Sequence, residues 1–335
     1  MSFQRAARTD KGVSAVVNVV SLKMRIDIEN LIEKLNSHLP KEIRIFTCIK
    51  TTKSFDSKCQ CTGRTYIYVL PTYALTPIDR LVKDEFRVTD EILETTSKIL
   101  QHFKGTHNFH NYTSEIKPNQ PQAKRYIRSF ECGKPFVIDG TEYVILTVNG
   151  QSFIRHHIRK MIGITIAIVR GYCGEEVIEK SWGHKKVDIP KAPGLGLLLR
   201  SLEFDGYNRK WGRDGEHKPI EWSKYEEEIL KFQDEYILPD IYKTEAEEKV
   251  MMQWMQTLVH HVFDYTEDDE GNEIYGRNRF EQKKKGDSAD DTVVQVEGEK
   301  EDKNAEDVKK RDLDNEKIEE SEDSPSVDEM EVKMG

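Results

Sequence analysis

The chain of 335 residues lacks the features that mark secreted, membrane and metal-binding proteins. It has only five cysteines, an odd number, without a Cys-x-x-Cys pair or an accompanying histidine cluster. We therefore expect reduced, mostly buried thiols in an intracellular protein. The longest apolar run, MIGITIAIV, is far shorter than the roughly 20 residues that a bilayer-spanning helix needs. The N-terminus shows no secretory signal and no clear transit peptide.

Fingerprints of nucleotide and nucleophile sites are also missing. The chain has no Gly-x-Gly-x-x-Gly, no Walker loop and no nucleophile elbow. His156 and His157 are adjacent, but neighbouring side chains on a helix project in different directions and no carboxylate lies one turn away. We therefore expect neither a metal site nor a nucleotide cofactor.

The negative charge is concentrated at the C-terminal end. Residues 287–335 hold 19 acidic and 7 basic residues, which leaves 41 acidic and 44 basic residues in the first 286. This tail has no aromatic residue and few large aliphatic ones, a composition that predicts disorder. A solvated appendage is the simplest interpretation, with a part in RNA affinity or partner docking as the alternative.

The hydrophobic pattern of the first part predicts an α+β fold. Residues 12–24 are apolar on both faces, which is typical of a central strand. Helical spacing over 28–39 predicts a helix that Asp27 caps and Pro40 stops. The segments 43–49 and 64–70 indicate two further strands.

The second part repeats this mixture. The sequence predicts a capped helix over 90–105, a hairpin turn at Asp139-Gly140, and a helix with one apolar stripe within 152–173. Strands are expected at 124–132, 142–150 and 194–204, and helices near 175–182 and over 222–260. We divide the chain into a first half (1–86), a second α+β half (87–206), a helical extension (207–262) and a disordered acidic tail (263–335).

Three polar groups could carry chemistry, and each has an ordinary structural alternative. Asp10 lies between Arg8 and Lys11 before a strand, where cations would keep its carboxylate ionised for use as a nucleophile or base. A simple turn is the alternative. Strand alternation places Arg64, Tyr66 and Tyr68 on one face, either as packing or as a platform for an extruded base.

The third group is the basic start of the helix within 152–173. Arg155 and Arg159 share one face at i, i+4, and His156 and Lys160 share the next. The helix dipole disfavours cations on the first turns, so a carboxylate or phosphates should compensate them. The alternative is a solvated basic stripe.

These motifs together resemble TruA-type tRNA pseudouridine synthases. ARTDKGVSA is similar to the Arg-Thr-Asp loop of that family, RTYIYVLP to its Arg-x-Tyr-x-Tyr strand, FIRHHIRKMIG to its Phe-x-x-His-x-x-Arg helix and APGLGLLL to its Gly-Leu strand. NSHLP, KGTHNFHNYTS, SWG and VDIPKAPGLGL are most similar to the eukaryotic branch, and the resemblance covers roughly residues 1–260.

The resemblance implies a pseudouridine synthase fold, with two ferredoxin-like halves around a central cleft and a mixed or antiparallel sheet. Asp10 would be the essential aspartate, Tyr66 would stack on the flipped uracil, and Arg159 would pair with Asp10. The residues expected to contact RNA are Arg8, Lys11, Arg64, Tyr68, Arg155, His156, His157, Lys160 and Leu197, of which Leu197 would form a wall of the pocket. The reaction would convert uridine to pseudouridine in tRNA, and in mRNA or other RNAs as a further option, without a cofactor.

Family members carry a strand–helix unit before the aspartate loop, so the resemblance predicts that this chain is truncated at its N-terminus. Exposure of the strand at 12–24 would then make the chain unstable or inactive. A catalytically inactive RNA-binding isoform is therefore the alternative function. The weak basic signal at Lys283–Gly286 favours the nucleus, with the mitochondrion as the alternative.

Overall fold

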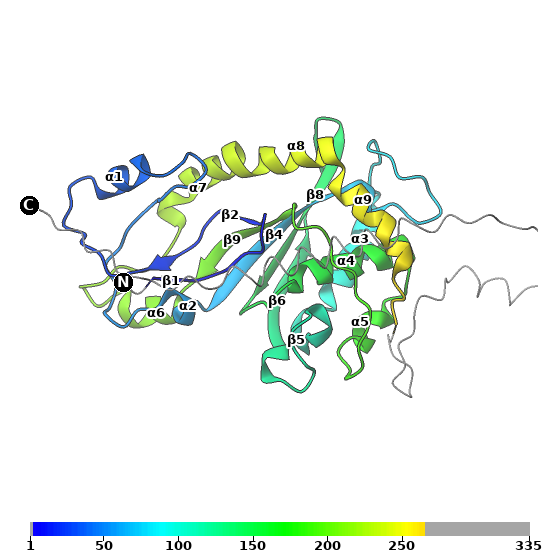
Figure 1. Ribbon diagram of the computed structural model, residues 1–335, viewed down its shortest axis with the longest axis horizontal. Coiled ribbons are helices and arrows are strands. Elements are labelled where there is room, and N and C mark those ends of the chain that lie inside the picture. The colour runs from blue at the N-terminus through cyan, green and yellow to red at the C-terminus, as the bar shows by residue number, and fades with distance from the viewer. Residues whose placement is uncertain (1–2, 265–335) are drawn as a thin grey trace, which may run out of the picture. The chain divides into compact units, whose positions relative to one another are not determined.

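The computed structural model describes residues 3–264. Its centre is a seven-stranded sheet with the order β2-β9-β4-β8-β6-β5, and β7 pairs with β8 (Figure 1). β2 is parallel to β9, whereas the other pairs are antiparallel, so the predicted α+β class with a mixed sheet is confirmed. The strands are β2 (Ser14–Ala15), β4 (Gly63–Pro71), β5 (Gly105–Asn108), β6 (Lys124–Cys132), β7 (Phe136–Ile138), β8 (Thr141–Gly150) and β9 (Leu197–Glu203).

A separate two-stranded ribbon joins β1 and β3, and helices make up most of the remaining regular structure. The ribbon strands are β1 (Gln4–Arg5) and β3 (Val20–Ser21). The helices are α1 (Leu31–Ser37), α2 (Ser57–Gln60), α3 (Asp90–Gln101), α4 (His157–Arg170), α5 (Glu176–Lys180), α6 (Asp205–Trp211), α7 (Glu226–Phe232), α8 (Leu238–Glu248) and α9 (Val250–Gln256). A π-helical segment, Gln233–Ile237, connects α7 to α8.

The sheet is covered on both faces, because side chains alternate along its central strand β4. Tyr66, Tyr68 and Leu70 enter one apolar cluster with residues of α3 and α4. Ile67 and Val69 point to the opposite face, where α7 and α8 cover them. Figure 1 shows α8 running over the sheet on the side away from α3 and α4.

The second half of the chain follows the sequence pattern closely. The Thr89 hydroxyl accepts a hydrogen bond from the Ile92 amide, so α3 is capped and begins where the helix over 90–105 was predicted, although it ends earlier, at Gln101. Asp139 and Gly140 have positive φ angles of 46° and 85° and form the predicted turn between β7 and β8. The sheet also joins the two predicted halves, because β4 pairs with β8 and β9. The domain boundaries and the central cleft stay predictions.

Three expectations for the first half are wrong. Residues 12–24 do not form one central strand: only β2 and β3 are regular, and β2 pairs with β9 alone within residues 3–264. Residues 43–49 form no strand, and Phe46 packs edge-on against Phe232 of α7 instead. Asp27 caps no helix, because its carboxylate binds Arg25 and α1 begins only after Asn30.

The burial of the cysteines was also predicted incorrectly. All five are free, but Cys48 and Cys59 are exposed and only Cys173 is buried. No helix among residues 3–264 has the length and apolarity that crossing a membrane requires. The acidic tail predicted for 263–335 lies outside the described residues, except for Phe263 and Asp264.

Candidate active site

The Asp10 loop owes its shape to Gly12. A hydrogen bond from the Val13 amide to the Asp10 carbonyl, 3.0 Å long, closes a four-residue turn. Gly12 has a φ of +76° at the third position, which glycine adopts without strain. The guanidinium of Arg64 donates to the Ala6 carbonyl at 2.9 Å and so fixes the start of the loop to β4. The turn therefore holds Asp10 in a defined place beside the sheet.

Asp10 and Arg159 form an ion pair across two distant segments. The distance between Arg159 Nη1 and Asp10 Oδ2 is 3.3 Å. The Arg159 side chain is 16% exposed and that of Asp10 is 25% exposed, so the pair is sheltered but the carboxylate reaches solvent. Partial burial strengthens the attraction compared with a fully exposed pair. Asp10 is thus the carboxylate that was expected to compensate the cations at the start of this helix.

A backbone carbonyl orients the same arginine from its other side. Arg159 Nε donates to the Ala192 carbonyl at 2.7 Å, and the Ala192 amide donates to the Arg159 carbonyl at 3.1 Å. A β-carbon on Gly194 would lie 3.8 Å from the guanidinium carbon of Arg159, so the chain passes closely here. Ala192 therefore holds both the side chain and the backbone of Arg159, and this leaves Nη1 of the guanidinium to bind Asp10.

Tyr66 completes the group from β4. Its ring packs edge-to-face against Phe153 at 5.3 Å between ring centres. Burial raises the pKa of the Tyr66 hydroxyl to about 12, and the Asp10 charge adds to this while Arg64 opposes it. The hydroxyl is therefore protonated at neutral pH and could donate to, or exchange a proton with, a bound group.

His156 lies against the same carboxylate in a left-handed conformation. Its φ is 63°, and its Nε2 is 3.9 Å from Asp10 Oδ2. Burial, followed by the Lys191 charge, lowers the pKa of His156 to about 4, although Asp10 opposes this. The ring is therefore neutral at pH 7, and Arg159 supplies the positive charge of the pair.

The other predicted cations occupy different settings. Arg8 and Lys11 are exposed beside Asp10 in the loop. Arg155 does not share a helix face with Arg159 as predicted, because α4 begins only at His157, after the left-handed His156. Arg155 instead forms an ion pair with Glu115 at 2.6 Å.

Four further candidates for RNA contact point inward to differing degrees. Tyr68 is 1% exposed and its hydroxyl donates to the Pro193 carbonyl at 2.8 Å, which is at odds with stacking on RNA. His157 and Leu197 belong to the buried core. Lys160 is half-buried and donates to the Asn111 carbonyl at 3.0 Å, and burial lowers its pKa to about 8. RNA contact by these residues stays a prediction.

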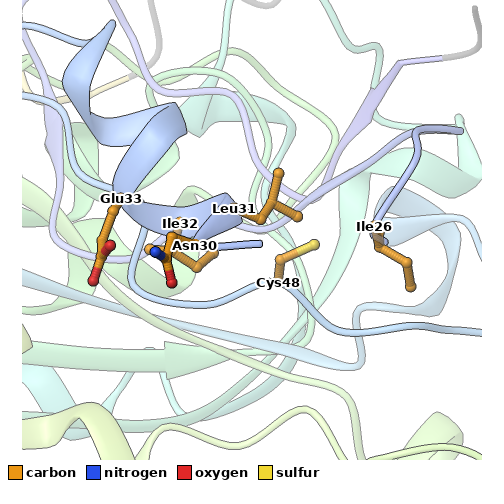
Figure 2. A pocket seen from close by; sticks show the side chains of 6 residues that line it. All are labelled: Ile26, Asn30, Leu31, Ile32, Glu33 and Cys48. Atoms are coloured by element: carbon orange, nitrogen blue, oxygen red, sulfur yellow. The ribbon is translucent and has the colours of Figure 1, made fainter. Parts of the chain in front are cut away.

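Sequence reasoning missed Phe153 as the partner of Tyr66 and the backbone carbonyl of Ala192 as the partner of Arg159. Phe153 and Ala192 both lie in motifs that stood out in the sequence. A motif does not specify, however, which distant residue its members contact, and Tyr66 and Arg159 lie far from these partners in the sequence. Within residues 3–264 no group of three or more histidine, cysteine or acidic side chains could hold a metal ion. A hollow of about 300 Å³ beside α1, lined by Leu31 and Cys48 among others, shares no residue with the Asp10 group (Figure 2).

Comparison with known proteins gives a consistent identification. The family described as tRNA pseudouridine synthase matches residues 99–205. Pseudouridylate synthase 1 homolog of Mus musculus is 50% identical over 267 residues, which are 79% of this chain and 63% of the relative. The Homo sapiens homolog is also 50% identical, with 62% of its length covered. tRNA pseudouridine synthase 1 of Yarrowia lipolytica is 33% identical, with 74% of this chain and 62% of the relative covered.

The chain thus spans less than two thirds of the length of these relatives. The identity of 50% nevertheless extends over most of its own residues, and the family match includes Arg159 and Ala192. On these grounds the chain belongs to the TruA-type tRNA pseudouridine synthase family.

Proposed function

We propose that this protein converts uridine to pseudouridine in tRNA, with Asp10 as the essential carboxylate. The observation that carries the proposal is the partly exposed Asp10–Arg159 pair beside Tyr66. Family membership and the names of the relatives support the same reaction. No contact in the described part of the chain favours the catalytically inactive alternative.

The reaction exchanges one bond of the nucleotide for another. The bond from uracil N1 to the ribose breaks, the base turns, and C5 forms the new bond to the ribose while its proton leaves and N1 gains one. A duplex base cannot reach a side chain, so the uridine must leave its stack first. The Asp10 carboxylate would attack the nucleotide or assist bond cleavage, and the Arg159 guanidinium would hold that carboxylate in position.

Tyr66 would act at the base itself. Its ring edge is fixed by Phe153, and its hydroxyl stays protonated up to a pH of about 12. Stacking of the ring on uracil and proton exchange at C5 are separate contributions. Replacement of Tyr66 by Phe retains the ring and removes only the hydroxyl, so it distinguishes them.

The proposal is tested by tritium release from tRNA that carries 5-tritiated uridine. We expect Asp10→Ala to lower the rate of release by at least about 10³-fold, because an essential catalytic group is lost. Binding of tRNA should stay within a few-fold of wild type. Asp27→Ala is the matched control, since Asp27 also pairs with an arginine but is exposed. Full release by Asp10→Ala, or tRNA binding without release by the wild-type chain, would contradict the proposal.

We extend the proposal to mRNA and other RNAs as substrates, and to the nucleus as the compartment. The first rests on recognition of a single extruded uridine, which other folded RNAs also offer. The second rests on the basic run before Gly286, which lies outside the described residues. Tritium release from non-tRNA transcripts tests the first proposal, and release confined to tRNA would refute it. Imaging of a fluorescent fusion, with the basic run intact or replaced, tests the second, and exclusion of the fusion from the nucleus would refute it.

A further inference from the structure

The segment 185–194 carries the carbonyl that orients Arg159, and two side chains outside the active site fix it. Asn111 binds its first part: Nδ2 of Asn111 donates to the Lys185 carbonyl at 3.0 Å, and Oδ1 accepts from the Val187 amide at 3.0 Å. Asn111 is buried and also donates to the Ser181 carbonyl at 2.8 Å. The beginning of the segment is therefore tied to the fold.

Asp188 binds the middle of the segment to the chain that follows the last helix. Its carboxylate accepts a hydrogen bond from the Val262 amide at 2.9 Å and lies 2.9 and 3.0 Å from His261 Nδ1. The Asp188 amide donates to the Asp264 carbonyl at 3.1 Å. Three contacts thus fasten residues 261–264 to Asp188, and we call this group the Asp188 clasp.

The Asp188 clasp is connected to the active site through the two neighbouring cations of α4. Burial lowers the pKa of Lys160, and the negative charge of Asp188 opposes that effect. The Lys160 ammonium also donates a hydrogen bond to the Asn111 carbonyl. Arg159, the preceding residue, binds the Ala192 carbonyl four positions after Asp188. Movement of the segment would therefore displace the group that directs Arg159 toward Asp10.

We propose that Asp188 is a positioning residue of this enzyme: with His261 and the Val262 amide it fixes the segment whose Ala192 carbonyl orients Arg159 toward Asp10. Asp188 contacts no reacting atom in this arrangement. Its effect would appear in the rate of the chemical step, because a displacement of about 1 Å in a catalytic group can cost about 100-fold in rate. This inference rests on the function proposed above.

The chain contains a matched control for the clasp. Asp214 accepts hydrogen bonds from the amides of Glu216 and His217 and lies 2.6 Å from His217 Nδ1. It has the same chemistry of a carboxylate, a histidine ring and a backbone amide, but shares no contact with the Asp10 group. Asp214→Ala should therefore leave the rate of tritium release unchanged.

The test compares kcat and KM for tritium release from tRNA in Asp188→Ala and Asp214→Ala. We expect Asp188→Ala to lower kcat by about 10- to 100-fold with KM within about threefold. Asp188→Asn retains an acceptor for both donors and should lose only a few-fold. His261→Ala should lower kcat as well, and its effect should not add to that of Asp188→Ala, because both remove one interaction. Equal kcat in the two alanine variants, or a loss confined to KM, overturns the proposal.

A second measurement does not depend on catalysis. Amide hydrogen exchange over residues 187–195 reports whether the Ala192 amide still binds the Arg159 carbonyl. We expect faster exchange there in Asp188→Ala but not in Asp214→Ala. Unchanged exchange refutes the clasp. If the wild-type chain released no tritium but exchange changed as expected, the proposed function would fail while the clasp stood. If Asp188→Ala does not fold, Asp188→Asn and His261→Ala supply both readouts.

Discussion

His157 is a fully buried histidine in an aromatic cage. Its ring lies 4.2 Å from that of Phe109 and 5.6 Å from that of Phe153. Neither ring nitrogen has a hydrogen-bond partner among residues 3–264. Burial, helped by the Arg125 charge, lowers the pKa of His157 to about 3. The sequence placed this residue beside His156 as a second RNA contact, yet one position along the chain separates a core residue from an active-site neighbour.

This burial predicts a pH dependence of stability. Between the ordinary histidine pKa of about 6.5 and the folded value of about 3, the unfolded chain binds a proton that buried His157 does not. The free energy of unfolding should therefore fall as the pH falls below about 6.5, by about 2 kcal/mol at pH 5 from this residue. His157→Leu should reduce that fall, as measured by urea unfolding at pH 7 and pH 5. His260→Gln, at an exposed position, should retain the wild-type difference; an unchanged pH dependence in His157→Leu would contradict the prediction.

At the scale of elements, the packing of segment 185–194 on α4 depends on Gly163. A β-carbon at Gly163 would overlap the Pro190 carbonyl and lie 3.2 Å from the Ala192 amide nitrogen. Glycine therefore allows this segment to approach the helix closely enough for Ala192 to reach Arg159. The sequence predicted the helix from its apolar stripe, but not that Gly163 determines the place of the Ala192 carbonyl.

We expect Gly163→Ala to lower the free energy of unfolding by about 1–3 kcal/mol through overpacking, and to reduce kcat by moving Ala192. Gly206→Ala is the matched control in α6, because a β-carbon there would make only an ordinary 3.7 Å contact with Thr62. Alanine at a helical position usually stabilises, by up to about 1 kcal/mol. Chemical denaturation of the two variants measures both effects. Equal free energies of unfolding in Gly163→Ala and Gly206→Ala would contradict the prediction, because they would show that segment 185–194 moves away from α4 without an energetic cost.

At the scale of the whole described chain, the C-terminal helices are part of the core. Ile229, Ile237 and Ile241 cover Leu198 and Tyr143 of the sheet. Glu245 of α8 is buried and accepts hydrogen bonds from the Tyr73 hydroxyl and, at 3.1 Å, from the Met251 amide. The helical extension predicted for 207–262 therefore completes one face of the sheet.

Glu245→Ala should destabilise the whole protein. It leaves the buried Tyr73 hydroxyl and the Met251 amide without an acceptor, and each such loss costs about 1–3 kcal/mol. Glu245→Gln retains an oxygen acceptor and should cost less. Glu247→Ala, at an exposed position of the same helix, should have little effect. Thermal unfolding followed by circular dichroism measures all three; a melting temperature of Glu245→Ala equal to that of Glu247→Ala would be the contrary result.

The sequence alone determined most elements of the second half and the residue types at the active site. Apolar periodicity and caps are local properties, so α3, α4 and the β7–β8 turn could be predicted from neighbouring residues. The local pattern misled at residues 12–24 and 43–49, because an apolar run becomes a strand only where another strand is available to pair with it.

Only the tertiary structure decided which of these residues meet. Asp10 and Arg159 are 149 positions apart, and no local pattern sets their separation of 3.3 Å. The left-handed turn at His156 directs Arg155 to Glu115 and leaves Arg159 to Asp10. Tyr66 and Tyr68 are both buried on one face of β4, but the Tyr68 hydroxyl donates to the carbonyl of Pro193, which lies 125 positions away. Such contacts depend on how distant segments pack around the sheet, which the order of residues along any single element does not specify.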